Sequence, residues 1–167
     1  MKTKVVLMIL TFALLNMSCE KITLENMSVE KYINLLKTES YDFMALPPFD
    51  SDDIPELLAY SSDDLILKRY PANPVSSFIA EDCKLGIYVL WTIESIRKSA
   101  IEDKTAIGRF PSLNPILSLK TAGDNTIDPE IAHLVAAQAY LDWWNSSDDF
   151  EQIKNINPLD ETDYYWR

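Results

Sequence analysis

Glycine is scarce in this chain, with three residues among 167. Runs that alternate apolar and polar residues are also rare, so a sheet joined by tight glycine turns is not expected. Histidine occurs once, which excludes a zinc site with two histidines. The sequence has no G-x-S-x-G nucleophile elbow, no phosphate-binding glycine loop and no H-E-x-x-H pair. These absences favour a helical protein and indicate no catalytic class, metal or cofactor.

Basic residues are outnumbered, with 15 Lys and Arg against 26 Asp and Glu and a formal net charge of −11. Binding to DNA or RNA depends on the neutralisation of phosphates, and attraction to anionic lipid headgroups also needs basic side chains. The charge therefore excludes nucleic acid as a partner and excludes electrostatic docking on an anionic membrane.

The N-terminus has the form of an export signal. Lys2 and Lys4 precede an apolar run over residues 5–15, which is too short to span a bilayer because a span needs about 20 residues. Ser18 follows and then Cys19, and a cysteine directly after a small residue indicates the bacterial lipoprotein type of signal.

We therefore expect residues 1–18 to be a signal peptide that is removed, and Cys19 to be acylated. Residues 19–27 form a tether and residues 28–167 a single domain. The lipid would make the membrane a partner and hold the protein in the bacterial envelope. We favour the outer membrane and leave the face open.

Cysteine occurs only twice, so acylation of Cys19 leaves Cys83 without a disulfide partner. We interpret Cys83 as a small buried residue of a helical stretch and not as a reactive thiol. A Cys19–Cys83 disulfide in an unlipidated secreted protein is the weaker alternative. A dyad of Cys83 with His133 is formally available, but nothing in the sequence indicates an activated thiol.

Apolar periodicity and helix start signals predict about five helices. They are expected over residues 28–37, from Asp53, over residues 76–99, from Asp128, and from Asp148. Residues 85–91 are apolar on all sides, which indicates a central, buried helix. Glu94 and Arg97, three positions apart, predict an ion pair where this helix returns to water.

Two of the start signals are specific. Asp53 and Glu56 match a capping box, with Pro55 in the first turn. The sequence Asp-Pro-Glu at 128–130 places a cap, a proline and an acid in the expected order. The helix that follows contains Ile131, Leu134, Val135, Leu141 and Trp144 and a narrow face of Ala132, Ala136 and Ala139 that would allow close helix packing.

The fold class expected is all-α: one compact domain of about five helices around a buried central helix. Residues 69–75 and 109–116 resemble each other, both with an Arg-aromatic-Pro start and a later Asn-Pro. A spacing of about 40 residues is in the range of HEAT-like helical pairs. The alternative, which we favour, is two similar proline-rich turns that each lead toward a helix.

Three Ser-Asp-Asp triplets lie at 51–53, 62–64 and 147–149. Carboxylates are calcium ligands, but no triplet has the spacing of an EF-hand loop. Each triplet lies where a helix is expected to begin, so helix capping is the favoured interpretation.

Aromatic residues are the remaining candidates for binding, because tryptophan and tyrosine form platforms for sugar rings and protein interfaces. The candidates are Trp143, Trp144, Tyr164, Tyr165 and Trp166. For the last three, docking back onto the domain is favoured over an exposed patch.

Five segments carry a family resemblance: Leu-Pro at 46–47, Asp-Ile-Pro-Glu-Leu-Leu at 53–58, Tyr-Pro-Ala-Asn-Pro at 70–74, Leu-Trp-Thr-Ile-Glu-Ser-Ile-Arg at 90–97 and Phe-Pro-Ser at 110–112. In these segments the chain resembles a family of small lipoproteins from gut Bacteroidetes whose function is uncharacterised. The resemblance implies an envelope lipoprotein and supplies no site.

Three hypotheses for function follow. The first is a non-catalytic envelope protein that binds a protein or glycan partner. The second is a hydrolase that uses carboxylates, either Glu94 or the aspartate triplets. The third is an acidic inhibitor or immunity protein, since an acidic helical surface can cover a basic site on another protein.

Overall fold

The computed structural model describes residues 23–77, 82–101, 107–121 and 128–167. The expected signal peptide, Cys19 and the first part of the tether lie outside these residues. The described helices are α2 (Val29–Lys37), α3 (Ile54–Leu58), α4 (Leu85–Ile101), α5 (Pro129–Trp144) and α6 (Phe150–Ile153), with 3-10 turns η1 (Ser51–Asp53) and η2 (Ile107–Arg109). The strands are β1 (Ile66–Leu67), β2 (Cys83–Lys84), β3 (Leu117–Leu119) and β4 (Tyr164–Trp166). Within the described ranges, the helices are all too short or too polar to cross a membrane.

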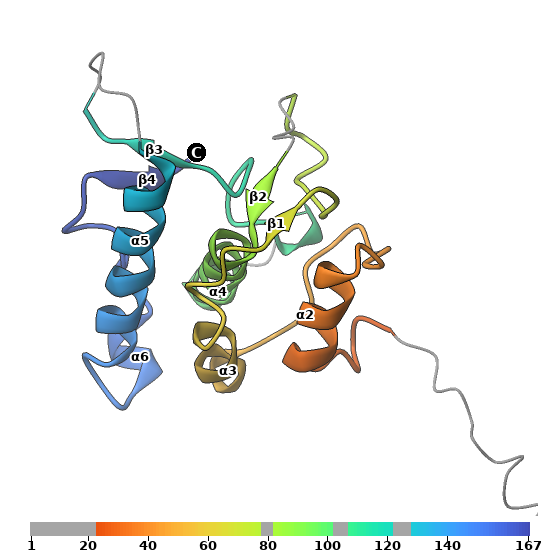
Figure 1. Ribbon diagram of the computed structural model, residues 1–167. Helices are drawn as coiled ribbons and strands as arrows, with labels where there is room; N and C mark the ends of the chain where they lie inside the picture. The colour runs from red at the N-terminus through yellow and green to blue at the C-terminus, as the bar shows by residue number, and fades with distance from the viewer. Residues whose placement is uncertain (1–22, 78–81, 102–106, 122–127) are drawn as a thin grey trace, which may run out of the picture.

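Helix α4 forms the centre of the molecule, between α2 on one side and α5 on the other (Figure 1). Every residue from Leu85 to Arg97 except Ile87 is buried. Because a helix that is apolar all round cannot face water, it is covered on all sides, and each fully buried large apolar side chain contributes about 1.5–3 kcal/mol. The prediction of a buried central helix is confirmed.

The start of α4 was predicted nine residues too early. Residues 76–77 are not helical, residues 78–81 lie outside the described chain, and Cys83 belongs to a strand. The first amides of the helix donate to backbone carbonyls of the preceding loop, Leu85 N to Leu65 O at 2.8 Å and Gly86 N to Asp63 O at 2.9 Å. These bonds satisfy the free amides without a capping side chain, so no local sequence signal marks the start.

The C-terminal half of α4 also differs from expectation. Glu94 and Arg97 form the predicted ion pair, but both side chains are buried, with 3% and 4% of each residue exposed. The prediction that these residues reach water is wrong. They turn inward because Tyr140 of α5 and the carbonyl of Lys154 offer hydrogen-bond partners there.

The domain is mostly helical but not purely all-α, because it contains two small antiparallel sheets. In the first, Leu67 of β1 lies opposite Cys83 of β2. In the second, Leu119 of β3 lies opposite Tyr164 of β4. Strands of two or three residues are too short for an alternating pattern to be recognisable in the sequence.

Helix starts are capped largely as the sequence predicts. Ser28 accepts a bond from Lys31 N at 3.2 Å, and α2 buries the four residues expected of it. Near α3 the capping box joins Asp50 and Asp53, one turn before the predicted pair of Asp53 and Glu56. The earlier box forms because a 3-10 turn precedes α3.

The two similar proline-rich turns lie against each other. Asn73 Nδ2 donates to Ser112 O at 3.2 Å, and Asn114 Nδ2 donates to Ser76 Oγ at 3.0 Å. Among the described residues the first turn leads to β2 and the second to β3, so neither begins a helix as predicted. HEAT-like helical pairs receive no support from this arrangement.

Candidate binding surface

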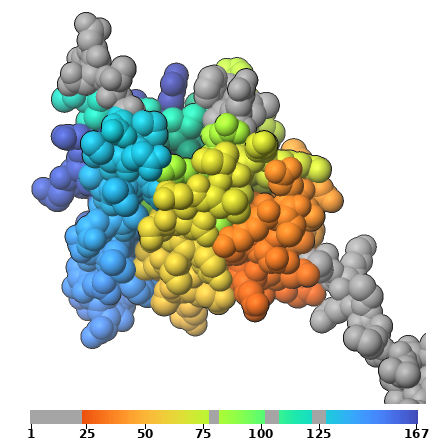
Figure 2. All heavy atoms as spheres, in the orientation of Figure 1, coloured from red at the N-terminus to blue at the C-terminus, as the bar shows by residue number. Residues whose placement is uncertain are grey.

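The outward side of α5 is largely aliphatic, and Gln138 and Asp142 are also exposed on it, with Gln138 Nε2 donating to Asp142 Oδ1 at 2.8 Å. Four large aliphatic side chains on it are between 36% and 62% exposed: Ile131, Leu134, Val135 and Leu141. Leu134, Val135 and Leu141 follow Ile131 by three, four and ten positions, which places all four residues on one side of the helix. In Figure 2 the α5 segment forms the left-hand surface of the molecule. We call these four residues the α5 stripe.

Small residues on the inner side explain why α5 packs this way. Ala132 and Ala136 are buried, as the alanine spacing predicts. His133 lies against Gly86 of α4, and a Cβ on that glycine would collide with the imidazole and with Ser61 O. The close approach of the two helices therefore selects the small face for the core, and the larger aliphatic face is left outside.

The charge around the α5 stripe is negative. Helix α5 contains no lysine or arginine, and its charged side chains are Glu130 and Asp142. Asp128 caps its N-terminus by accepting a bond from Glu130 N at 2.9 Å. Lys84 contacts both Glu130 and Asp64, so one cation serves two carboxylates. The hydrogen bonds from Lys84 to Glu130 and Asp64 raise the pKa of the Lys84 ammonium group.

A hollow of about 640 Å³ lies beyond the C-terminal end of α5. Trp144 and Phe150 line it, with their ring centroids 6.3 Å apart. Asp52 and Asp148 also line it, and neither carboxylate is paired with a cationic side chain in the described part of the chain. Leu141 and Trp144 are three positions apart on one helix, so the hollow lies beside the last residue of the α5 stripe, on the side of η1 and α3.

The structure separates the five aromatic residues predicted as binding candidates: Trp143, Trp144, Tyr164, Tyr165 and Trp166. Trp143 and Tyr164 are buried in the core, and Trp144 lines the acidic hollow. Tyr165 is 43% exposed in β4, and the half-buried Trp166 donates from Nε1 to Tyr140 OH at 2.8 Å. The predicted docking of the C-terminal segment on the domain is confirmed by the pairing of β4 with β3.

The buried carboxylate of Glu94 belongs to a closed network. It accepts bonds from Arg97 Nε at 2.8 Å, from Arg97 Nη2 at 2.6 Å and from Tyr140 OH at 2.9 Å. Burial by itself lowers the pKa of Arg97, but the hydrogen bonds and charge of Glu94 outweigh this effect and raise it. With its oxygens occupied in this way, Glu94 is placed to hold α4, α5 and β4 together and not to meet a substrate.

Cys83 and His133 have separate surroundings. Burial raises the pKa of the Cys83 thiol, which makes a thiolate nucleophile unfavourable. His133 Nε2 donates to Ser61 O at 2.8 Å, while Nδ1 lies 3.5 Å from Asp64 Oδ1. The carbonyl oxygen of Ser61 can only accept a hydrogen bond, so the Nε2 atom of His133 carries a proton.

The aspartate triplets act on the local backbone. Asp149 accepts a bond from Glu151 N at 3.0 Å and caps α6, one residue after the predicted cap. The triplet at 62–64 does not begin a helix: Asp63 pairs with Lys37 at 2.8 Å and Asp64 with Lys84 at 2.9 Å. Across the described residues, no group of three or more histidine, cysteine or acidic side chains is arranged to hold a metal ion.

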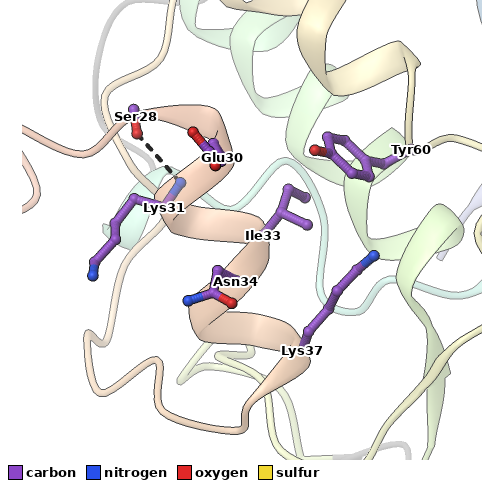
Figure 3. A pocket seen from close by; sticks show the side chains of 7 residues that line it. All are labelled: Ser28, Glu30, Lys31, Ile33, Asn34, Lys37 and Tyr60. Atoms are coloured by element: carbon purple, nitrogen blue, oxygen red, sulfur yellow. Dashed lines mark hydrogen bonds between the residues drawn. The ribbon is translucent and has the colours of Figure 1, made fainter.

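Two further hollows differ from the α5 surface. One, of about 520 Å³, lies beside α2, where Lys37 points across toward Tyr60 (Figure 3). The Lys37 ammonium lies 5.3 Å from the centroid of the Tyr60 ring, so this ring already carries a cation of the same chain. The other, of about 480 Å³, is an apolar hollow between β2, β3 and the start of α5, with Cys83 in its wall.

The chain belongs to the family described as "Domain of unknown function (DUF4943)", whose profile matches residues 23–167. No curated protein and no solved structure matches the chain. The family match thus covers the whole described domain and assigns no activity to it.

Proposed function

We propose that the protein is a non-catalytic binding protein of the cell envelope, anchored by a lipid on Cys19, and that it binds a protein partner on the outer side of α5. The α5 stripe is the observation that carries the proposal. A helix that is apolar on its inner and outer sides is typical of a helix covered on both. A group of exposed large aliphatic side chains bordered by polar residues is typical of an interaction site.

Glu94 and two of the acids beside Trp144 are engaged within the protein. Glu94 is enclosed by Arg97 and Tyr140. Of the acids in the hollow beside Trp144, Asp149 caps α6, and Glu151 pairs with Lys154 at 2.6 Å. A catalytic pair of carboxylates needs two groups free to meet one substrate. Glu94, Asp149 and Glu151 do not meet this condition, whereas Asp52 and Asp148 do, so a hydrolase that uses these two aspartates is the second candidate function.

Site-specific photo-crosslinking in the native host tests the protein-binding proposal. A photoreactive residue would replace Leu134 in the α5 stripe, or Met44 as the control, which is 74% exposed on a loop outside α5. We expect a discrete protein adduct from position 134 and not from position 44. The adduct should disappear when Leu141→Asp is added.

Equal adducts at the two positions would contradict the proposal. A heterogeneous, glycosidase-sensitive adduct at position 134 would instead favour the glycan alternative. The anchor is tested separately by feeding cells an alkyne-labelled fatty acid. Label should enter the wild-type chain and not Cys19→Ala, and an unprocessed, unlabelled chain with Met1 intact would refute the anchor.

A further inference from the structure

The α5 stripe has the dimensions of a helix-binding surface. From Ile131 to Leu141 the helix rises about 15 Å, or about three turns. Side chains spaced by three and four residues form ridges into which a second helix packs. An extended peptide instead needs the free edge of a sheet, which α5 does not offer.

Charge distinguishes between the possible occupants. Acidic groups lie at both ends of the α5 stripe: Asp128 and Glu130 at the start, Asp142 and Asp148 toward the end. A second copy of the chain would place its own acidic residues against these acidic residues, because both ends of the surface are negatively charged. An anionic membrane would be repelled for the same reason.

A partner with basic groups beside an apolar stripe meets no such repulsion. Asp52 and Asp148 in the hollow beside Trp144 are unpaired by cations within the described residues, and Trp144 can hold a cation on its ring face. An arginine or lysine at one end of a bound helix would thus meet both carboxylates and an aromatic ring.

On this basis we infer that the partner segment is an amphipathic helix with an apolar stripe flanked by lysine and arginine. The inference rests on the proposed function, because it names the partner chemistry of the same surface. The apolar stripe of the partner packs on the α5 stripe, and its basic flanks face Asp142 and the acidic hollow.

Three designed peptides test the inference directly. They share one leucine stripe and one length, and their flanking positions are all lysine, all glutamine or all glutamate. The protein used is residues 20–167, because the described core residues lie between Met27 and Tyr164 and are retained in it. Binding is measured by isothermal calorimetry, and peptide helicity by circular dichroism.

We expect the lysine peptide to bind at least about tenfold more tightly than the glutamine peptide, and the glutamate peptide to bind least. The preference should shrink as ionic strength rises from about 0.01 M to 0.15 M, since the screening length falls from about 30 Å to 8 Å. Leu134→Gln should weaken all three peptides. Asp142→Asn/Asp148→Asn should reduce only the preference for lysine, and Met44→Gln should change nothing.

Equal binding of the three peptides, or unchanged binding in Leu134→Gln, would overturn the inference. Dimerisation of residues 20–167 in ultracentrifugation that is lost in Leu134→Gln would assign the surface to a second copy. Binding to zwitterionic vesicles that is lost in the same variant would assign it to lipid. If the crosslink at position 134 forms but the captured partner has no basic amphipathic helix, the proposed function stands and this inference fails.

Discussion

The ion pair of Glu94 and Arg97 allows a quantitative test of the core. Arg97→Met removes the two bonds that Arg97 donates to Glu94, at 2.8 and 2.6 Å, and one to Lys154 O at 3.1 Å. The carboxylate of Glu94 stays buried with Tyr140 OH as its remaining partner. Leaving one charge of a buried pair without its partner costs about 3–5 kcal/mol. We expect the free energy of unfolding to fall by about that amount.

The matched control removes both charges. In Glu94→Met/Arg97→Met no buried charge remains. The loss is limited to the buried Tyr140 OH left without its acceptor, about 1–3 kcal/mol, and the part-buried Lys154 O, about 0.5–1.5 kcal/mol. Arg97→Lys keeps the charge but not the two-pronged contact, so its loss should lie between the wild type and Arg97→Met.

Urea unfolding of residues 20–167 at pH 7, followed by tryptophan fluorescence and circular dichroism, measures these losses. An equal loss in the single and double variants would refute the assignment of a buried, coupled ion pair.

Three other outcomes can be measured on the same protein. Leu90→Ala should lower the free energy of unfolding by about 2–5 kcal/mol, because it leaves a cavity beside α4. Replacement of the exposed Leu113 by Ala should lower it by at most about 0.5 kcal/mol. Equal losses would mean that the core is misplaced. Because burial raises the pKa of the Cys83 thiol, it should be inert to a thiol reagent at pH 8 until urea unfolds the chain; rapid labelling of the native protein would contradict this. Burial also raises the pKa of Tyr32 and Tyr88, because the folded core holds both hydroxyls in the neutral form. The contribution of these two neutral hydroxyls to the free energy of unfolding is complete below pH about 10 and is lost as the pH rises above that value. The part of the rise in absorbance at 295 nm that is absent from Tyr32→Phe/Tyr88→Phe should coincide with the loss of helical signal, and its appearance in the still-folded chain would argue against burial.

Sequence patterns were sufficient where the determinants are local. Helix α2 has an amphipathic stripe and a serine cap within ten residues, and its buried positions agree with the prediction. The start of α5 follows from Asp128 and Pro129 in the same way. The burial of α4 could be predicted because a run that is apolar on all sides has no polar face to turn toward water.

Contacts between residues far apart in the sequence determine the features that local sequence patterns did not predict. The start of α4 is set by carbonyls of Asp63 and Leu65, about 20 positions earlier. In the candidate site, α5 has two apolar sides, and the choice between them depends on the contact of His133 with Gly86. Of the five aromatic candidates, only Trp144 lies on the surface now proposed, because strand pairing and core packing, neither visible in local sequence, position the others.

The central position of α4 has a consequence for the time course of synthesis. The chain is made from its N-terminus, at about 5–20 residues per second. The 66 residues that follow α4 therefore need roughly 3–13 s. Phe110, which stacks on Trp91, is made first, Tyr140, which bonds to Glu94, is made later, and β4 is made last, so one side of α4 is covered in stages. The nascent chain thus passes through a stage in which its central helix is already made and part of the covering of that helix is not, and any factor that holds the growing chain has to act during that stage.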